Sequence, residues 1–237
     1  MFILDKNKFG DCNLSNAKEF VEFWRYYYPL DRTTIFKEKE LISYKDELNL
    51  KNDLTDKNIK RLLRWKDPHW LTEKILSGPK KDEDNPKVMK VLKELKSLNE
   101  FRYGQIHEDV FLEKIKNIYP DGFIWRIFLL HICRPHEYPI ADRYVFNAFS
   151  SLTEPKNRKT PKEWNVFKEY YFAYKEFFFT ITKSAGIVTQ EPKGYENNIF
   201  DIITRLKQVD NALFAYGQFL ETYNKTTEEK NDENPFP

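Results

Sequence analysis

Asp142 stands at a position where a carboxylate could do chemistry. It comes immediately before residues 143–149 (RYVFNAF), in which apolar residues recur at helical spacing. A carboxylate at the start of a helix accepts backbone N–H hydrogen bonds, and the helix dipole keeps it ionised. An ionised carboxylate can stabilise the positive charge that develops on a sugar when its glycosidic bond breaks, and it can orient the attacking water. The alternative interpretation is that Asp142 is a structural cap only.

A sharp turn followed by an apolar helix is the second feature. Residues 119–122 (YPDG) form the turn, because proline fixes one φ angle and glycine accepts the positive φ that a reversal needs. Residues 123–133 (FIWRIFLLHIC) contain no glycine or proline, and only Arg126 and His131 are polar, so we expect a buried helix. The prolines of the next segment, RPHEYP, end this helix.

A helix, a tight turn, a buried helix and a capped aspartate, in this order, resemble the helix-hairpin-helix DNA glycosylase superfamily. Gly122 matches the last glycine of that family's hairpin, and Asp142 lies twenty residues beyond it, the spacing that the family uses for its catalytic aspartate. Residues 138–145 (YPIADRYV) are similar to the family's aspartate segment. The chain departs from the pattern at Pro120, which replaces the other hairpin glycine, and at Ile124, where the bifunctional members carry a nucleophilic lysine.

The resemblance implies a monofunctional DNA glycosylase that acts on double-stranded DNA. Such an enzyme flips a damaged or modified base out of the stack and hydrolyses its N-glycosidic bond, which leaves an abasic site. Asp142 would be the catalytic residue, and with isoleucine at position 124 no associated lyase step is expected. The activity could serve base-excision repair or defence against phage DNA that carries modified bases. The alternative is a non-catalytic helical DNA- or protein-binding module on the same scaffold.

Further residues are candidates for contacts with DNA or with a flipped base. Backbone amides of the turn, at the N-terminus of a helix, could meet a phosphate. The candidate DNA-binding residues are Pro120, Gly122, Lys114, Lys116, Arg143, Arg158 and Lys159. The weaker candidates for the substrate pocket are Trp125, His131, Tyr144, Trp24 and Tyr27. Each candidate also has a plainer interpretation, either as a solvated charge or as a core side chain.

No cofactor is expected to be required. The chain has two cysteines, Cys12 and Cys133, without a CxxC pair, and it contains no HExxH motif and no glycine-rich phosphate loop. These absences argue against a zinc site and against a nucleotide-dependent enzyme. The resemblance adds one exception, a monovalent cation held by backbone carbonyls of the hairpin.

The remaining sequence predicts an all-α fold of about ten helices, because no stretch alternates with period two between turn signals. The pattern predicts helical turns over 70–76, one continuous apolar stripe over 88–98 and a last helix over 199–220. The resemblance implies two lobes with a central cleft. The hairpin would lie in a middle lobe of about 37–137, and a second lobe would combine 1–36 with 138–225. The polar tail, residues 226–237, is expected to be disordered.

Composition sets the broad class. Of the 237 residues, 41% are hydrophobic and 16% aromatic, which favours a packed globular protein. The net charge of +2, from 39 Lys and Arg against 37 Asp and Glu, neither favours nor excludes DNA as a partner. No run approaches the roughly eighteen apolar residues of a membrane span. We therefore expect a cytoplasmic monomer that associates with the nucleoid when it is bound to DNA.

Overall fold

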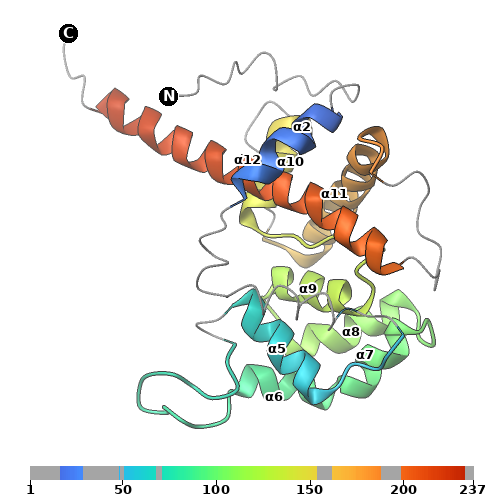
Figure 1. Ribbon diagram of the computed structural model, residues 1–237. Coiled ribbons are helices and arrows are strands. Elements are labelled where there is room, and N and C mark those ends of the chain that lie inside the picture. The colour runs from blue at the N-terminus through green and yellow to red at the C-terminus, as the bar shows by residue number, and fades with distance from the viewer. Residues whose placement is uncertain are drawn as a thin grey trace. The chain divides into compact units, whose positions relative to one another are not determined.

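The computed structural model describes residues 17–28, 48, 51–67, 71–153, 162–187 and 199–232 (Figure 1). Within these ranges the chain is helical, with one isolated β-bridge and no strand, which confirms the all-α class. None of the described helices combines the length and the apolar content needed to cross a membrane. The helices are α2 (Ala17–Trp24), the 3₁₀-helix η2 (Arg25–Tyr27), α5 (Asp56–Lys66), α6 (Pro86–Lys93), α7 (Leu95–Arg102), α8 (Glu108–Ile118), α9 (Phe123–Cys133), α10 (Arg143–Thr153), α11 (Trp164–Ser184) and α12 (Ile199–Asp232).

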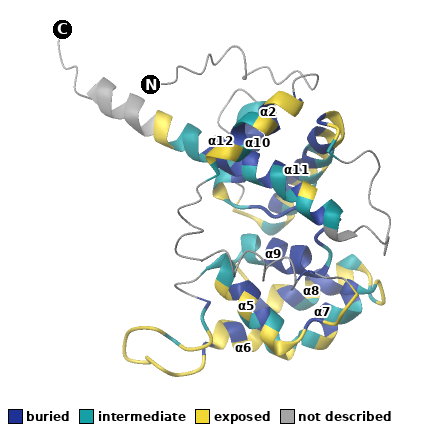
Figure 2. Cartoon of the chain, in the orientation of Figure 1, coloured by how far each residue is buried: buried dark blue, intermediate teal, exposed yellow. Residues whose placement is uncertain are grey.

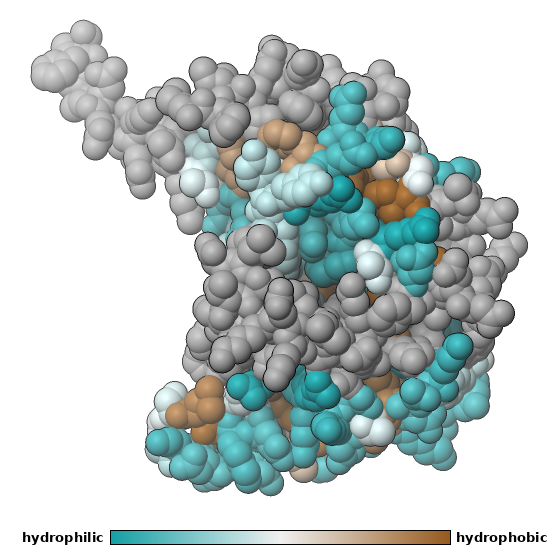
Figure 3. All heavy atoms as spheres, viewed as in Figure 1, coloured by the Kyte–Doolittle hydropathy of each residue, from teal (hydrophilic) through white to brown (hydrophobic). Residues whose placement is uncertain are grey.

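The chain divides into two compact units. Unit 1 consists of Met1–Leu30, Ala141–Glu191 and Thr204–Pro237, and unit 2 consists of Asp31–Ile140 and Pro192–Ile203. The helices of each unit turn buried residues toward a core of their own and exposed residues outward (Figure 2). The described surface on the face shown in Figure 3 is mostly hydrophilic, with small hydrophobic groups between. Asp142 belongs to unit 1, and the turn at 119–122 belongs to unit 2.

The core of unit 2 is built on α7, α8 and α9, which contact one another. Phe101 of α7 and Phe111 of α8 stack with ring centroids 4.3 Å apart. Helix α9 has the predicted bounds, and its residues from Arg126 to Cys133 are all buried. A helix that is apolar on every side is expected at the centre of a domain, because it has no face that prefers water.

Two local predictions for unit 2 are wrong. The stripe over 88–98 is not one helix, because α6 ends and α7 begins at Glu94, whose ψ of 11° departs from helical geometry. Residues 71–76 are not helical either. They form one antiparallel β-bridge, between Lys74 and Asp84. Gly78, with a φ of +86°, lies in the turn between these two residues.

Unit 1 is rich in aromatic contacts. Phe146 of α10 lies against Phe167, Tyr170 and Tyr174 of α11, with ring centroids 5.1–5.6 Å apart. These three aromatic residues of α11 therefore belong to the core of unit 1. Helix α12 continues to Asp232, so residues 226–232 of the predicted disordered tail are helical. Charged Glu and Lys residues in that stretch have good helix propensity and extend a helix that is already nucleated.

A close backbone contact joins α12 to the start of α10. A Cβ atom placed on Gly217 would lie 1.9 Å from the carbonyl oxygen of Tyr144 and 2.5 Å from its carbonyl carbon. Only glycine allows this approach, since real Cβ contacts are never so short. The contact fixes the first turn of α10, next to Asp142, against α12. The ring of Tyr144 meets Phe214 of α12 edge-on, with centroids 4.9 Å apart.

We predict that Gly217→Ala destabilises the protein by about 3 kcal/mol, because the added methyl group collides with backbone. Helix propensity alone predicts the opposite sign, a gain of about 1 kcal/mol. Chemical denaturation measures the difference. Thr222→Ala, at an exposed position of the same helix, should change stability by less than about 0.5 kcal/mol. A stabilised Gly217→Ala protein would contradict the close contact.

Candidate functional site

Asp142 caps α10 in the predicted manner. Its Oδ1 accepts hydrogen bonds from the backbone N–H of Tyr144 at 2.9 Å and of Val145 at 3.0 Å. The residue is half-buried, and no hydrogen bond from a described residue reaches Oδ2. Both amide donors lie at the N-terminal, positive end of the α10 dipole. Asp142 is thus an anchored carboxylate with one oxygen held by the helix and a second oxygen outside the cap.

The two residues after Asp142 are held by α12. Arg143 forms an ion pair with Glu221 at 3.3 Å, with two thirds of the arginine side chain exposed. The Arg143 guanidinium also donates to the Tyr144 hydroxyl at 2.9 Å. Arg143 is therefore an accessible positive charge beside the cap, where it could meet a phosphate only by sharing or leaving Glu221.

A buried polar group near Asp142 was missed by the sequence analysis. Lys207 and Asp210 form an ion pair on α12, and Asp210 is only 5% exposed. Burial raises the pKa of the Tyr174 phenol well above its ordinary value, and the charges of Asp210 and Asp142 act in the same direction. Tyr174 therefore stays protonated within electrostatic reach of both carboxylates. The only sequence signal was a charge pair at i,i+3 spacing on the side of α12 that also carries Phe214 and Gly217.

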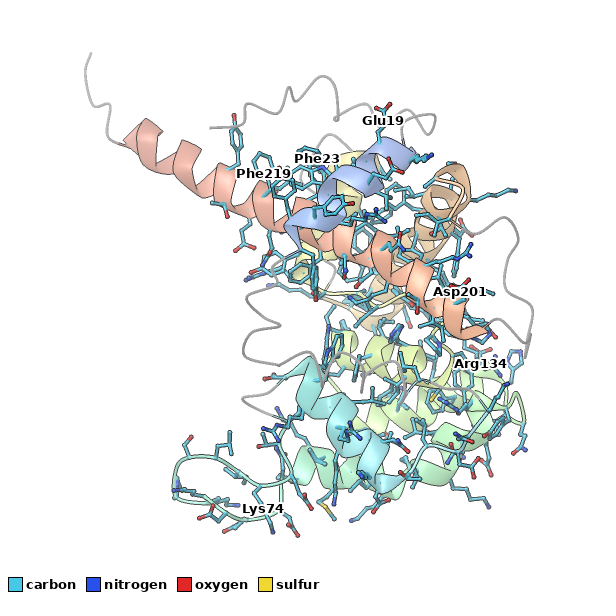
Figure 4. All side chains as sticks on the ribbon, in the orientation of Figure 1. Glu19, Phe23, Lys74, Arg134, Asp201 and Phe219 are labelled. Carbon is cyan, nitrogen blue, oxygen red and sulfur yellow. The ribbon has the colours of Figure 1, made fainter. Side chains whose placement is uncertain are left out.

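The two aromatic pocket candidates from the N-terminal part of unit 1 differ. Trp24 is 3% exposed, and its ring lies 5.1 Å from Tyr216 and 5.3 Å from Phe219. Phe23 of α2 is labelled in Figure 4. Its ring lies with its centroid 5.2 Å from that of Trp24. Trp24 is thus a core residue of unit 1. Tyr27 is 50% exposed and lies at the edge of this cluster.

The turn at 119–122 exists, but its glycine does not have the predicted backbone angle. Gly122 has a φ of −96°, so no positive φ is required there. Limited space favours glycine at this position instead. A Cβ atom at this position would lie 3.0 Å from Cδ1 of Trp125 and 3.1 Å from Cβ of Tyr119. The Gly122 N–H donates to the Tyr119 carbonyl at 3.3 Å and is therefore already used within the turn.

The buried side chain of Arg126 hydrogen-bonds to the backbone of the turn. Its Nε donates to the Tyr119 carbonyl at 2.8 Å, and its Nη2 donates to the Pro120 carbonyl. The residue is 1% exposed, and its guanidinium lies 5.3 Å from the centroid of the Phe123 ring. Arg126 is the largest fully buried side chain of the described residues, although the sequence showed it only as a polar interruption of an apolar helix.

The two lysines proposed as phosphate contacts have acidic partners. Lys114 donates to the Ser97 hydroxyl at 3.0 Å and lies 3.8 Å from Glu100, so its ammonium is directed toward α7. Lys116 pairs with Glu113 at 3.4 Å. A shallow depression of about 570 Å³ on α8 also has a mixed lining. It is formed by Asp109, Val110, Glu113, Lys114 and Asn117. Positive charge is therefore not concentrated on α8.

The other candidates are placed as follows. Trp125 is half-buried and stacks on Tyr119 with centroids 5.9 Å apart. His131 is buried, and its Nδ1 donates to the Tyr138 carbonyl at 2.7 Å, as in a hydrogen-bonded core histidine. Pro120 is exposed at the tip of the turn. Arg158 and Lys159 lie outside the described residues.

No group of three or more His, Cys, Asp or Glu side chains in the described part of the chain is arranged to hold a metal ion. Comparison with protein-family models, with curated proteins and with solved structures found no match to this chain. The fold and the site thus define an all-α protein with an anchored, half-exposed aspartate at a helix N-terminus.

We predict that the cap and the charge of Asp142 can be separated by substitution. Asp142→Ala should lower stability by about 1 kcal/mol, because the amides of Tyr144 and Val145 lose their acceptor. Asp142→Asn should stay within about 0.5 kcal/mol of the wild type, since asparagine caps helices as well as aspartate does. Denaturant titration at neutral pH measures both. Equal losses for the two variants would show that the charge, rather than the cap, stabilises α10.

Proposed function

We propose that the protein is a monofunctional DNA glycosylase in which Asp142 is the catalytic residue. One observation carries the proposal: the Asp142 carboxylate is held at a helix N-terminus through Oδ1, while Oδ2 receives no hydrogen bond from a described residue. The twenty-residue spacing from Gly122 supports it. The substrate would be double-stranded DNA with a damaged or modified base, in repair or in defence against phage DNA.

The reaction needs few protein groups. As the bond between C1′ and the base nitrogen breaks, positive charge spreads over the sugar ring, and a nearby carboxylate lowers the energy of that state. The base leaves with the bonding electrons of the broken bond. Water then adds to C1′ and loses a proton, which balances the charge on the departed base. An abasic sugar remains. Asp142 would supply the negative charge and orient the water, and the two cap hydrogen bonds would fix its position.

We expect excision without a lyase step, because Ile124 offers no amine at that position to form a Schiff base with the abasic aldehyde. Tyr144 is half-buried and belongs to the same unit as Asp142. It remains a candidate for contact with the substrate base.

A second candidate function is a non-catalytic binding module. It is favoured by the charges around the turn, where Asp121 is exposed and Lys116 is paired with Glu113. Such a turn is poorly suited to a phosphate, because like charges repel. The module would bind a protein, or would bind DNA through other residues.

An abasic-site assay tests the proposal. The wild type, Asp142→Asn and Asp109→Asn would be incubated with duplexes that carry oxidised, alkylated, deaminated or glucosylated bases. We expect the wild type to release one of these bases and Asp142→Asn to be slower by at least about a hundredfold. Asp109→Asn, a matched change in the first turn of α8, should act as the wild type does.

The outcomes separate the two functions. Release of the base by Asp142→Asn at the wild-type rate would remove Asp142 from the mechanism. Absence of release from every duplex, together with equal DNA affinity of all three proteins, would favour the binding module. Absence of any salt-dependent DNA affinity would leave only a protein partner.

A further inference from the structure

The carbonyl side of the turn at 119–122 carries a charge that the resemblance to DNA glycosylases does not predict. That resemblance implies a monovalent cation held by backbone carbonyls of the hairpin. In this chain the carbonyls of Tyr119 and Pro120 both accept hydrogen bonds from the guanidinium of Arg126. The question is whether a metal ion and this guanidinium can share the turn.

The residues do not fit a bound cation. Two of the turn's carbonyl oxygens already have a donor, and a Na⁺ or K⁺ ion needs several oxygens free to coordinate it. A metal ion at these oxygens would also lie beside a guanidinium of like charge. Arg126 is 1% exposed, so its side chain cannot swing into water without opening the first turn of α9.

We propose that the guanidinium of Arg126 takes the place of the hairpin cation. The positive charge on the turn carbonyls is then a covalent part of the chain, held one helical turn beyond Gly122. The conformation of the turn, and any binding through it, is therefore independent of Na⁺ and K⁺. This inference concerns the free protein and does not rest on the proposed function.

Guanidinium chemistry suits this position. The group is planar and always protonated, and its Nε and one Nη point in similar directions, so it can bond two neighbouring carbonyls at once. The ring of Phe123 lies 5.3 Å away and adds a cation–π contact. The carboxylates of Asp121 and Glu113 favour the charged form, as shown by their effect on the pKa of Arg126, which burial lowers.

The test compares melting temperatures in KCl, NaCl and tetramethylammonium chloride at equal ionic strength, with no DNA present. Tetramethylammonium is too large and too weak a ligand partner to enter a carbonyl site. We expect the wild type to melt at the same temperature in all three salts. Arg126→Ala should melt about 5 °C lower or more, because the Pro120 carbonyl loses the Arg126 donor and the Tyr119 carbonyl keeps only the Gly122 N–H at 3.3 Å. It should also melt higher in KCl or NaCl than in tetramethylammonium chloride.

Arg102 provides the matched control. It is buried in the same unit, 3% exposed, and its Nη1 donates to the Ile132 carbonyl at 2.9 Å. Arg102→Ala should also lose stability, but without a preference among the three salts. Arg126→Lys, which keeps a positive charge, should melt between the wild type and Arg126→Ala and should show no salt preference. It serves in place of the alanine variant if that protein does not fold.

The inference is overturned if the wild type melts higher in KCl or NaCl than in tetramethylammonium chloride. It is also overturned if Arg126→Ala is as stable as the wild type or gains no salt preference, or if Arg126→Lys gains one. None of these results depends on base excision. A protein without glycosylase activity could still show the expected melting behaviour in the three salts, and an active glycosylase could still fail to show it.

Discussion

The approach of α12 to the first turn of α10 is the constraint on which the geometry around Asp142 depends. Gly217 has no side chain, so its backbone meets the Tyr144 carbonyl directly, and Phe214 packs against the Tyr144 ring. Asp142 caps the turn that is fixed in this way. Its carboxylate is therefore positioned by two elements of unit 1 that lie far apart in the sequence. A flexible cap would lose much of its value for catalysis, because misplacement of a reacting group slows a reaction steeply.

The starts of α9 and α10 each pair backbone groups with a charged side chain, but the backbone groups differ: amides at α10 and turn carbonyls at α9. At α10 a carboxylate accepts the first amides, which the helix dipole favours. At α9 the first residue is preceded by Gly122, which has no side chain to cap with, and Arg126 satisfies the carbonyls of the turn instead. Both arrangements pair buried or half-buried backbone groups with a charged partner, as buried polar groups require. They produce one helix start with an accessible negative charge and another whose positive charge is sealed inside.

The distribution of charge bears on how this protein could meet DNA. Lys114 and Lys116 of α8 are paired with Glu100 and Glu113, while Arg143 beside Asp142 is mostly exposed. The Glu221 side chain is only 21% exposed, so Arg143 would meet a phosphate at least cost by sharing Glu221 rather than by leaving it. Under the proposed function, Arg143 would contact a phosphate beside the Asp142 carboxylate. The net charge of +2 provides little long-range attraction and neither favours nor excludes DNA.

The sequence by itself determined the helical class, the bounds of α9 and the capping role of Asp142. These features are local, because apolar periodicity and cap chemistry act over a few neighbouring residues. Tertiary structure decided the rest. The sequence showed Arg126 as an interruption of an apolar helix and Gly122 as a left-handed residue. In the structure Arg126 is a buried donor to the carbonyls of the turn before it, and a Cβ atom on Gly122 would crowd Trp125 and Tyr119. Gly217 of α12 meets the backbone of α10, a contact between segments far apart in the sequence. Burial and close approach depend on which segments meet, and no periodicity in one segment specifies that.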